Sequence, residues 1–285
     1  MPLALGKSIL RQCGDVLADF GVFCTFVGHT MQWLVYGGLS WKNIRLILPQ
    51  LFDVGVRSVP VISVTGAFIG MVLAVEAYSQ FKAIGQENRL GVIINLSVVK
   101  QIGPILCAIM LAGRVGGALA AVMLAGRVGG ALTAELGTMN VTEQLDALRV
   151  MGTDPIRYLV VPRFLACVFL TPILTIFSDF LGILGGWFIA VVVLGIPNSP
   201  YWYYSSVENW QIMEGLIKSV FFGASIGLIS CYKGFTSGAG ASGVGRACTD
   251  SFVSSFIAIM ILNFIFAKML KEMYIALYGY HGIFG

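Results

Sequence analysis

The residue types that usually bind metals or act as nucleophiles are few and widely spaced in this chain. The two histidines, His29 and His281, lie far apart, and no H-E-x-x-H motif is present. The cysteines form no C-x-x-C pair and lie mostly in apolar stretches (Cys13, Cys24, Cys107, Cys167, Cys231 and Cys248). This distribution is typical of small buried hydrophobes rather than of a zinc site or disulfide framework. We therefore expect no metal site and no catalytic residue.

Two glycine-containing stretches resemble phosphate-binding loops only superficially. Gly6-Lys7-Ser8 ends like a P-loop, but Met1 stands where that motif requires its first glycine. Residues 238–243 fit G-x-G-x-x-G, but they connect two apolar segments, whereas a dinucleotide site follows a strand. The chain is therefore expected to bind no cofactor itself, and it is not expected to be an enzyme.

Ionisable residues within apolar segments are stronger candidates. Glu76, Lys100, Asp179 and Lys218 interrupt long apolar runs. Ionisable groups inside a membrane are costly and often mark a site or a pathway, which makes them functional candidates. A lysine near the end of a span can instead extend to the lipid headgroups. Both interpretations are open for Lys100 and Lys218.

Residues 140–152, NVTEQLDALRVMG, have the pattern of a short amphipathic helix. Asn140 and Glu143 have the spacing of a capping box, and Gly152 is a typical helix end. One face is apolar (Val141, Leu145 and Leu148). Such a helix could lie on the bilayer or dock into a cytoplasmic partner, and the pattern alone favours neither.

The elements that position these residues follow from composition. Of 285 residues, 57% are hydrophobic and 11% are charged, and the mean hydropathy is +0.86. A soluble domain is about 45–50% apolar and about 25% charged, so a soluble enzyme, a disordered chain and a fibrous protein are excluded. The net charge of +4 is too small to indicate nucleic-acid binding. A multi-pass helical membrane protein remains.

Hydropathy predicts an all-α integral membrane protein. Residues 1–53 form an N-terminal interfacial amphipathic helix and elbow, with no removable signal peptide. Residues 54–278 form a five-span domain, with a cytoplasmic loop at 137–163 between spans two and three, and 279–285 form an outer tail. The spans are expected at 54–80, 91–136, 164–194, 213–232 and 249–270.

Lysine and arginine placement predicts the orientation. These residues gather in the N-terminal region, in 137–163 and in 233–246, whereas the aromatic loop 196–211 has none. Cytoplasmic loops carry the excess of basic residues, so the N-terminus is expected inside and the C-terminus outside.

Residues 108–133 contain a tandem duplication of a 13-residue unit. Ten consecutive positions, Met110–Leu119 and Met123–Leu132, are identical. An insertion of this length adds about 20 Å of helix and rotates the second copy by about 220°, so Arg114 and Arg127 cannot share a face. The helix is expected either to extend beyond the membrane or to break near one of its glycine pairs.

Several motifs together resemble one family. The run from Gly103 to Pro155, read with one repeat copy removed, strongly resembles the permease subunit of MlaE-type lipid ABC transporters. The stretches FIGMVLAVEAY (68–78), LIKSVFFG (216–223) and GRACT (245–249) do so too. The resemblance covers roughly residues 45–270, and the E-L-G-T-M…T-E-Q-x-D-A-L stretch is its most specific part.

The resemblance implies a homodimeric permease in the bacterial inner membrane that moves phospholipids between the inner and outer membranes and serves outer-membrane asymmetry. ATP would be hydrolysed by separate cytoplasmic ABC ATPase subunits. A periplasmic ring of MCE-domain proteins is a further expected partner, with a small STAS-type subunit as an optional accessory.

The resemblance also implies two sets of site residues. The ATPase-docking helix would contain Glu143, Gln144, Leu145, Asp146 and Leu148. A lipid site near the outer leaflet, between the protomers, would be lined by the outer half of the first span and by residues close to it (Met71, Val72, Val75, Glu76, Tyr78, Lys100, Gln101 and Lys218). Apolar side chains suit acyl chains, and a phosphate needs a cation.

The chain departs from the family pattern in two places. Lys100-Gln101 stands where an Arg-Glu pair is usual, so an acidic partner is missing. Glu76 is expected to compensate by pairing with a basic residue at the outer end, with Lys100 as the first candidate. The duplication is the second departure, since the family has one copy. The alternative function is a stand-alone secondary transporter or channel, for which Asp179 is the only clear mid-span acid. A purely structural membrane scaffold is a third reading, against which the pattern of 140–152 argues.

Overall fold

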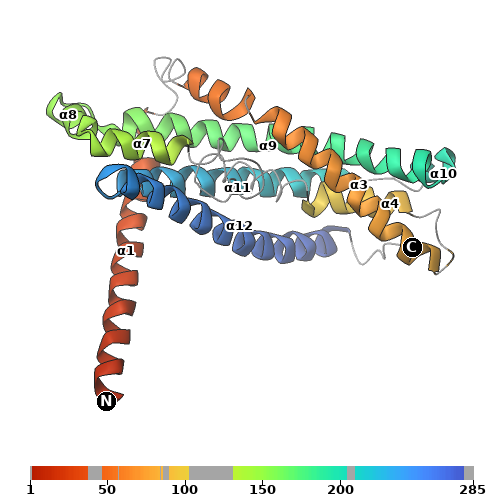
Figure 1. The fold of residues 1–285 in the computed structure, drawn as a ribbon, viewed down its shortest axis with the longest axis horizontal. Helices are drawn as coiled ribbons and strands as arrows, with labels where there is room; N and C mark the ends of the chain where they lie inside the picture. Colours follow the sequence, from red (N-terminus) through yellow and green to blue (C-terminus); the bar gives the residue numbers. More distant parts are fainter. Residues whose placement is uncertain are drawn as a thin grey trace.

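The computed structural model describes residues 2–37, 47–56, 58–83, 85, 90–102, 131–203 and 209–278, and within these ranges it is helical without a strand. Figure 1 shows the arrangement. The α-helices are α1 (Pro2–Gly37), α3 (Val59–Ala83), α4 (Leu90–Ser97), α7 (Ala131–Val141), α8 (Gln144–Val150), α9 (Val161–Trp187), α10 (Asn198–Tyr203), α11 (Asn209–Phe235) and α12 (Gly240–Tyr278). Short π-helical turns are η1 (Phe52–Val56), η3 (Val98–Ile102), η4 (Ile156–Val160) and η5 (Phe188–Val193).

Within the described ranges, four helical segments are long and apolar enough to cross a membrane: Val59–Ala83, Ile156–Val193, Trp210–Phe235 and Gly240–Ala276. Such segments satisfy their backbone internally, as lipid requires. They confirm a multi-pass helical membrane protein and match four of the five predicted spans. The other predicted span, with the tandem duplication, falls mostly on residues 103–130, which lie outside the described residues.

The described loops gather at two ends of the bundle (Figure 1). One end holds α8 and the turn between α11 and α12, and the other holds α10 and the end of α3. This grouping agrees with the predicted placement of the 137–163 and 233–246 loops on one side, and of the described parts of the 82–89 and 196–211 loops on the other.

Small residues let α3 and α9 approach closely. A Cβ added to Gly70 would overlap the carbonyl oxygen of Gly182, and one added to Gly66 would lie 2.7 Å from the carbonyl oxygen of Ser178. Small residues four apart, such as Gly66 and Gly70, are typical of tightly packed membrane helices. The core continues from this contact through Leu174 of α9 to α11.

Helix α1 runs across the direction of the spans rather than along it (Figure 1). Near its end, Trp33 Nε1 donates a hydrogen bond to Asp154 Oδ2 at 2.7 Å, and the Arg157 guanidinium lies 5.0 Å from the Trp33 ring centroid. Phe26 packs edge-on against Tyr232 of α11. Aromatic contacts and one hydrogen bond to a carboxylate therefore attach α1 to the bundle at the α8 end.

Candidate functional site

Three charged side chains meet between the start of α11 and η3. Lys218 Nζ lies 2.7 Å from Glu214 Oε1, and Lys100 Nζ lies 3.2 Å from Glu214 Oε2. Lys218 Nζ is also 3.5 Å from the backbone oxygen of Lys100. The side chains of Glu214 and Lys218 are 1% and 0% exposed, and that of Lys100 is 35% exposed. We call these three residues the Glu214 cluster.

The cluster follows from helical spacing and from charge. Glu214 and Lys218 are four residues apart on α11, so their side chains lie on one face of the helix. Lys100 reaches the same carboxylate from η3. A buried ion is tolerated only when it is paired and hydrogen-bonded. Two ammonium groups share one carboxylate, so the cluster carries a formal charge of +1, which suits a phosphate oxygen.

The predicted pairing of Glu76 with Lys100 is wrong in this structure, because Lys100 pairs with Glu214. Glu76 lies on the exposed side of α3, whereas α11 brings a buried carboxylate directly to Lys100. Glu214 was not singled out from the sequence. The available signal was its position four residues before Lys218, the spacing of a helical ion pair.

The predicted lipid-site residues are divided by the fold. Lys100 and Lys218 come together in the Glu214 cluster. On α3, Val72 and Val75 are exposed, whereas Met71 and Tyr78 are half-buried. Helix α3 packs on α9 and α4, and the cluster lies between α11 and η3, so these are separate packing interfaces. The backbone of Gln101 lies in η3, and its side chain lies outside the described part of the structure.

Comparison with known proteins assigns the chain to a protein family. A family model described as "Permease MlaE" matches residues 47–122 and 116–269. The chain belongs to the MlaE permease family. The two matched stretches overlap at 116–122, inside the tandem duplication, as expected where the MlaE-family pattern has one copy of the repeated unit.

Curated relatives cover nearly the whole chain. A probable ABC transporter permease protein of Rickettsia typhi is 38% identical over 93% of this chain and 96% of its own length. Another from Synechocystis is 39% identical over 86% of this chain and 88% of its own length. The intermembrane phospholipid transport system permease protein MlaE of Haemophilus influenzae is 33% identical over 94% of this chain and 96% of its own length.

In this MlaE-family chain, the expected docking helix appears as α8 after a sharp turn. Its bounds are Gln144–Val150, with Glu143 at φ 58° and ψ 14° before its first residue. Leu145 is 2% exposed and holds α8 against its surroundings, while Gln144 and Asp146 are exposed and Leu148 is half-buried. Leu145 therefore faces inward and Gln144 and Asp146 face solvent, whereas Val141, predicted on the apolar face, and Val150 are exposed.

The predicted capping box is wrong, but the predicted helix end is confirmed. Asn140 lies in the last turn of α7 rather than at a helix start, and its side-chain amide donates to Ser237 O at 3.1 Å. Glu143 makes no side-chain cap hydrogen bond. Helix α7 begins at Ala131, nine residues before Asn140, so Asn140 is not at a helix N-terminus that it could cap. Gly152 has φ +73°, and Thr153 N donates to Leu148 O at 3.0 Å, as in a glycine-terminated helix.

Proposed function

We propose that this chain is the permease subunit of an ABC transporter that moves phospholipids between the inner and outer membranes. The observation that carries the proposal is the separation of two features along one bundle. The Glu214 cluster, in the first turns of α11, lies toward the α10 end, and α8 lies at the opposite end (Figure 1). Family membership and the phospholipid transport named for the Haemophilus relative support it.

In this proposal the Glu214 cluster binds the lipid phosphate near the outer leaflet. Lys100 and Lys218 supply the cations, and Glu214 holds both ammonium groups in place. Glu76 shares the exposed face of α3 with Val72 and Val75 and borders the path of the acyl chains. The exposed apolar face of α3, with Val72 and Val75, lines the path of the acyl chains where two protomers of a homodimer meet.

The other end of the bundle couples to ATP hydrolysis in a partner subunit. Helix α8 and the residue before it offer solvent-facing polar side chains for docking, namely Glu143, Gln144 and Asp146. Half-buried Leu148 lies on the same short helix, which buried Leu145 holds in place. Helix α1 lies in the cytoplasmic interface of the inner membrane, which fits its course across the spans (Figure 1). The remaining proposed partners are a periplasmic MCE-domain ring and an optional STAS-type subunit.

Binding of the ATPase tests the coupling end. The purified permease, co-expressed with its ATPase, is expected to retain it on an affinity column. The exposed double variant Gln144→Ala/Asp146→Ala is expected to lose it, because the docking contacts are removed while buried Leu145 stays. Lys268→Ala, an exposed charge on α12, is the matched control and is expected to keep the ATPase. Equal retention by both variants would contradict docking at α8.

A stand-alone secondary transporter or channel is the second candidate. One observation favours it: Asp179 Oδ1 is buried in α9 and has no hydrogen-bond partner within the described part of the chain, as expected for an ion or proton site within a span. Liposomes that contain this chain alone, without ATPase or nucleotide, distinguish the two. Movement of lipid or ions through such liposomes that is lost in Asp179→Asn would favour the stand-alone function.

A further inference from the structure

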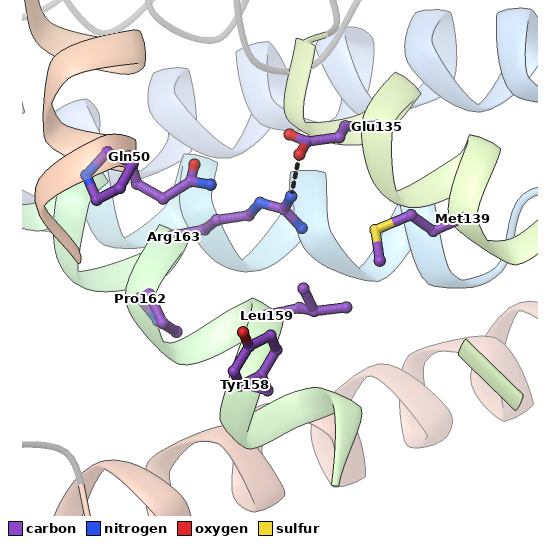
Figure 2. A pocket seen from close by; sticks show the side chains of 8 residues that line it. Gln50, Glu135, Met139, Tyr158, Leu159, Pro162 and Arg163 are labelled. Carbon is purple, nitrogen blue, oxygen red and sulfur yellow. Dashed lines mark ion pairs between the residues drawn. The ribbon is translucent and has the colours of Figure 1, made fainter. Parts of the chain in front are cut away.

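A cavity of about 240 Å³ opens at the α8 end, far from the Glu214 cluster along the bundle. Its walls come from the helical segment 47–51, from α7, and from η4 with the first turn of α9. Figure 2 shows the lining side chains. They are Pro49, Gln50, Glu135, Met139, Tyr158, Leu159, Pro162 and Arg163.

Arg163 is the most unusual residue of this cavity. Its side chain is 2% exposed, and Nη2 pairs with Glu135 Oε1 at 2.8 Å. Nε and Nη1 are also buried, and neither has a hydrogen-bond partner among the described residues. Buried guanidinium nitrogens are almost always satisfied, so two unsatisfied ones beside an open volume indicate a missing acceptor. In Figure 2 the guanidinium lies among Gln50, Glu135 and Met139, at the edge of the cavity.

The cavity carries both signs of charge. Arg163 provides the cation, and Glu135, whose side chain is 54% exposed, provides the anion with one oxygen in the ion pair. A simple anion would be attracted by Arg163 and repelled by Glu135. A zwitterion with a phosphate and an ammonium avoids this conflict, because each charge of the ligand meets its opposite.

The size and the lining of the cavity indicate which zwitterion fits. A volume of about 240 Å³ is below the range of about 300–1,000 Å³ usual for drug-sized ligands, so it admits a headgroup but not a whole lipid. Four apolar residues line the wall beside Gln50 and Tyr158, and they suit the glycerol end of a lipid (Pro49, Met139, Leu159 and Pro162). The first turns of an apolar span also lie at headgroup depth in a membrane.

We propose that this cavity binds the phosphoethanolamine headgroup of a phospholipid from the adjacent leaflet. Arg163 Nε and Nη1 donate to the phosphate, and Glu135 accepts from the ammonium. Because α7 carries Glu135 and leads to α8, an occupied cavity holds the segment before α8 in one position. The site is distinct from the Glu214 cluster and does not depend on the proposed transport function.

Photo-crosslinking of the full-length chain in detergent tests the proposal. The probe is a short-chain phosphatidylethanolamine with a diazirine near its headgroup, and adducts are mapped by peptide mass spectrometry. Adducts are expected on the peptides that contain Met139 and Tyr158. Unlabelled phosphatidylethanolamine should compete with the probe about tenfold better than phosphatidylglycerol or inorganic phosphate. Neither competitor has an ammonium for Glu135, and one lost charge-assisted contact corresponds to about a tenfold loss of affinity.

Single substitutions test the contribution of individual lining residues to binding. Met139→Trp fills the cavity and is expected to abolish these adducts, whereas Val141→Trp, exposed on the same helix, should keep them. Arg163→Met should also abolish them. Glu135→Gln, at an exposed position that should fold, should remove the preference for phosphatidylethanolamine over phosphatidylglycerol.

Three results would overturn the proposal. Adducts at Met139 and Tyr158 that survive in a folded Met139→Trp variant would place the lipid elsewhere. Equal competition by inorganic phosphate would make the cavity a free-phosphate site, and equal competition by phosphatidylglycerol in the unmodified chain would remove the role of Glu135. Because the readout is local binding, a failed transport assay would leave this result unaffected.

Discussion

The carboxylate of Glu214 lies 2.7 Å from the ammonium of Lys218, one turn further along α11, and both side chains are at most 1% exposed. Neither charge would be stable alone at such burial, because each needs the other to offset lost hydration. Lys100 joins them from a segment more than 100 positions earlier in the chain. The pair thus links α11 to η3 and holds two cations at one place.

Removing Glu214 should destabilise the fold. Glu214→Gln leaves two ammonium groups close together without a carboxylate, and breaking a buried pair costs about 3–5 kcal/mol. We expect a clearly lower melting temperature of the purified protein in detergent. Glu76→Gln, an exposed acid on α3, is the control and should melt like the unmodified chain. A Glu76→Gln protein that is as unstable as Glu214→Gln would show that Glu76 carries the pairing role.

The pair can also be removed as a unit. In Glu214→Gln/Lys218→Met neither buried charge of α11 remains, so much of the loss in the single variants should be recovered. The double-mutant cycle should therefore give a coupling free energy between Glu214 and Lys218 of about 0.5–3 kcal/mol or more. Additive effects of the two single substitutions would contradict a direct interaction.

The α3–α9 contact should not tolerate a methyl group at Gly70. Gly70→Ala places a Cβ against the backbone of Gly182, and overpacking costs about 1–3 kcal/mol or more when backbone must move. Thermal unfolding should show this loss. Gly21→Ala on α1, where the added Cβ meets nothing within 4 Å beyond the adjacent residues and backbone of its own helix, should instead be neutral or stabilising. Equal stability of both variants would mean that the helices do not pack this closely.

The turn before α8 should prefer glycine over a branched residue. Glu143 has φ 58°, a left-handed conformation that costs an L-residue about 1–2 kcal/mol. Glu143→Gly should therefore be at least as stable as the unmodified chain, and Glu143→Val should be less stable. If loss of the carboxylate matters for docking, Glu143→Gly should bind the ATPase more weakly despite its stability. Equal melting temperatures for the glycine and valine variants would contradict the left-handed turn.

The attachment of α1 should depend on one indole. Trp33→Phe removes the hydrogen bond to Asp154, worth about 1.5–3 kcal/mol for a charged acceptor. Hydrogen exchange in the last turns of α1 should become faster. Tyr36→Phe, at a position 82% exposed, should leave exchange unchanged. Unchanged exchange in Trp33→Phe would indicate that the aromatic contacts with Tyr232 suffice.

Hydropathy and charge placement predicted most of the fold, because a membrane span is a local property of about 20 residues. Four described spans and the grouping of loops at two ends follow from that signal. Gly152 was also predictable, since a left-handed helix end favours glycine at one position. The capping box failed because Asn140 belongs to a helix that starts well before it.

The candidate sites were predicted less well, because they depend on contacts between distant segments. Lys100 and Lys218 were named from their apolar surroundings, but Glu214, which joins them, was not. Arg163 and Glu135, 28 positions apart, also carry no local signal of their pairing. A family resemblance indicates which motifs matter, but it does not replace the geometry that pairs particular side chains.

ATP-dependent lipid transfer in a reconstituted transporter tests the central claim most directly. Proteoliposomes would contain this chain with its ATPase and MCE-domain partners, and labelled phospholipid would be followed between donor and acceptor. Transfer is predicted to require ATP and to fall at least tenfold in Lys218→Met/Glu214→Gln, a double variant chosen to avoid an unpaired buried charge. Transfer at the same rate without nucleotide, or undiminished in a folded double variant, would contradict the account.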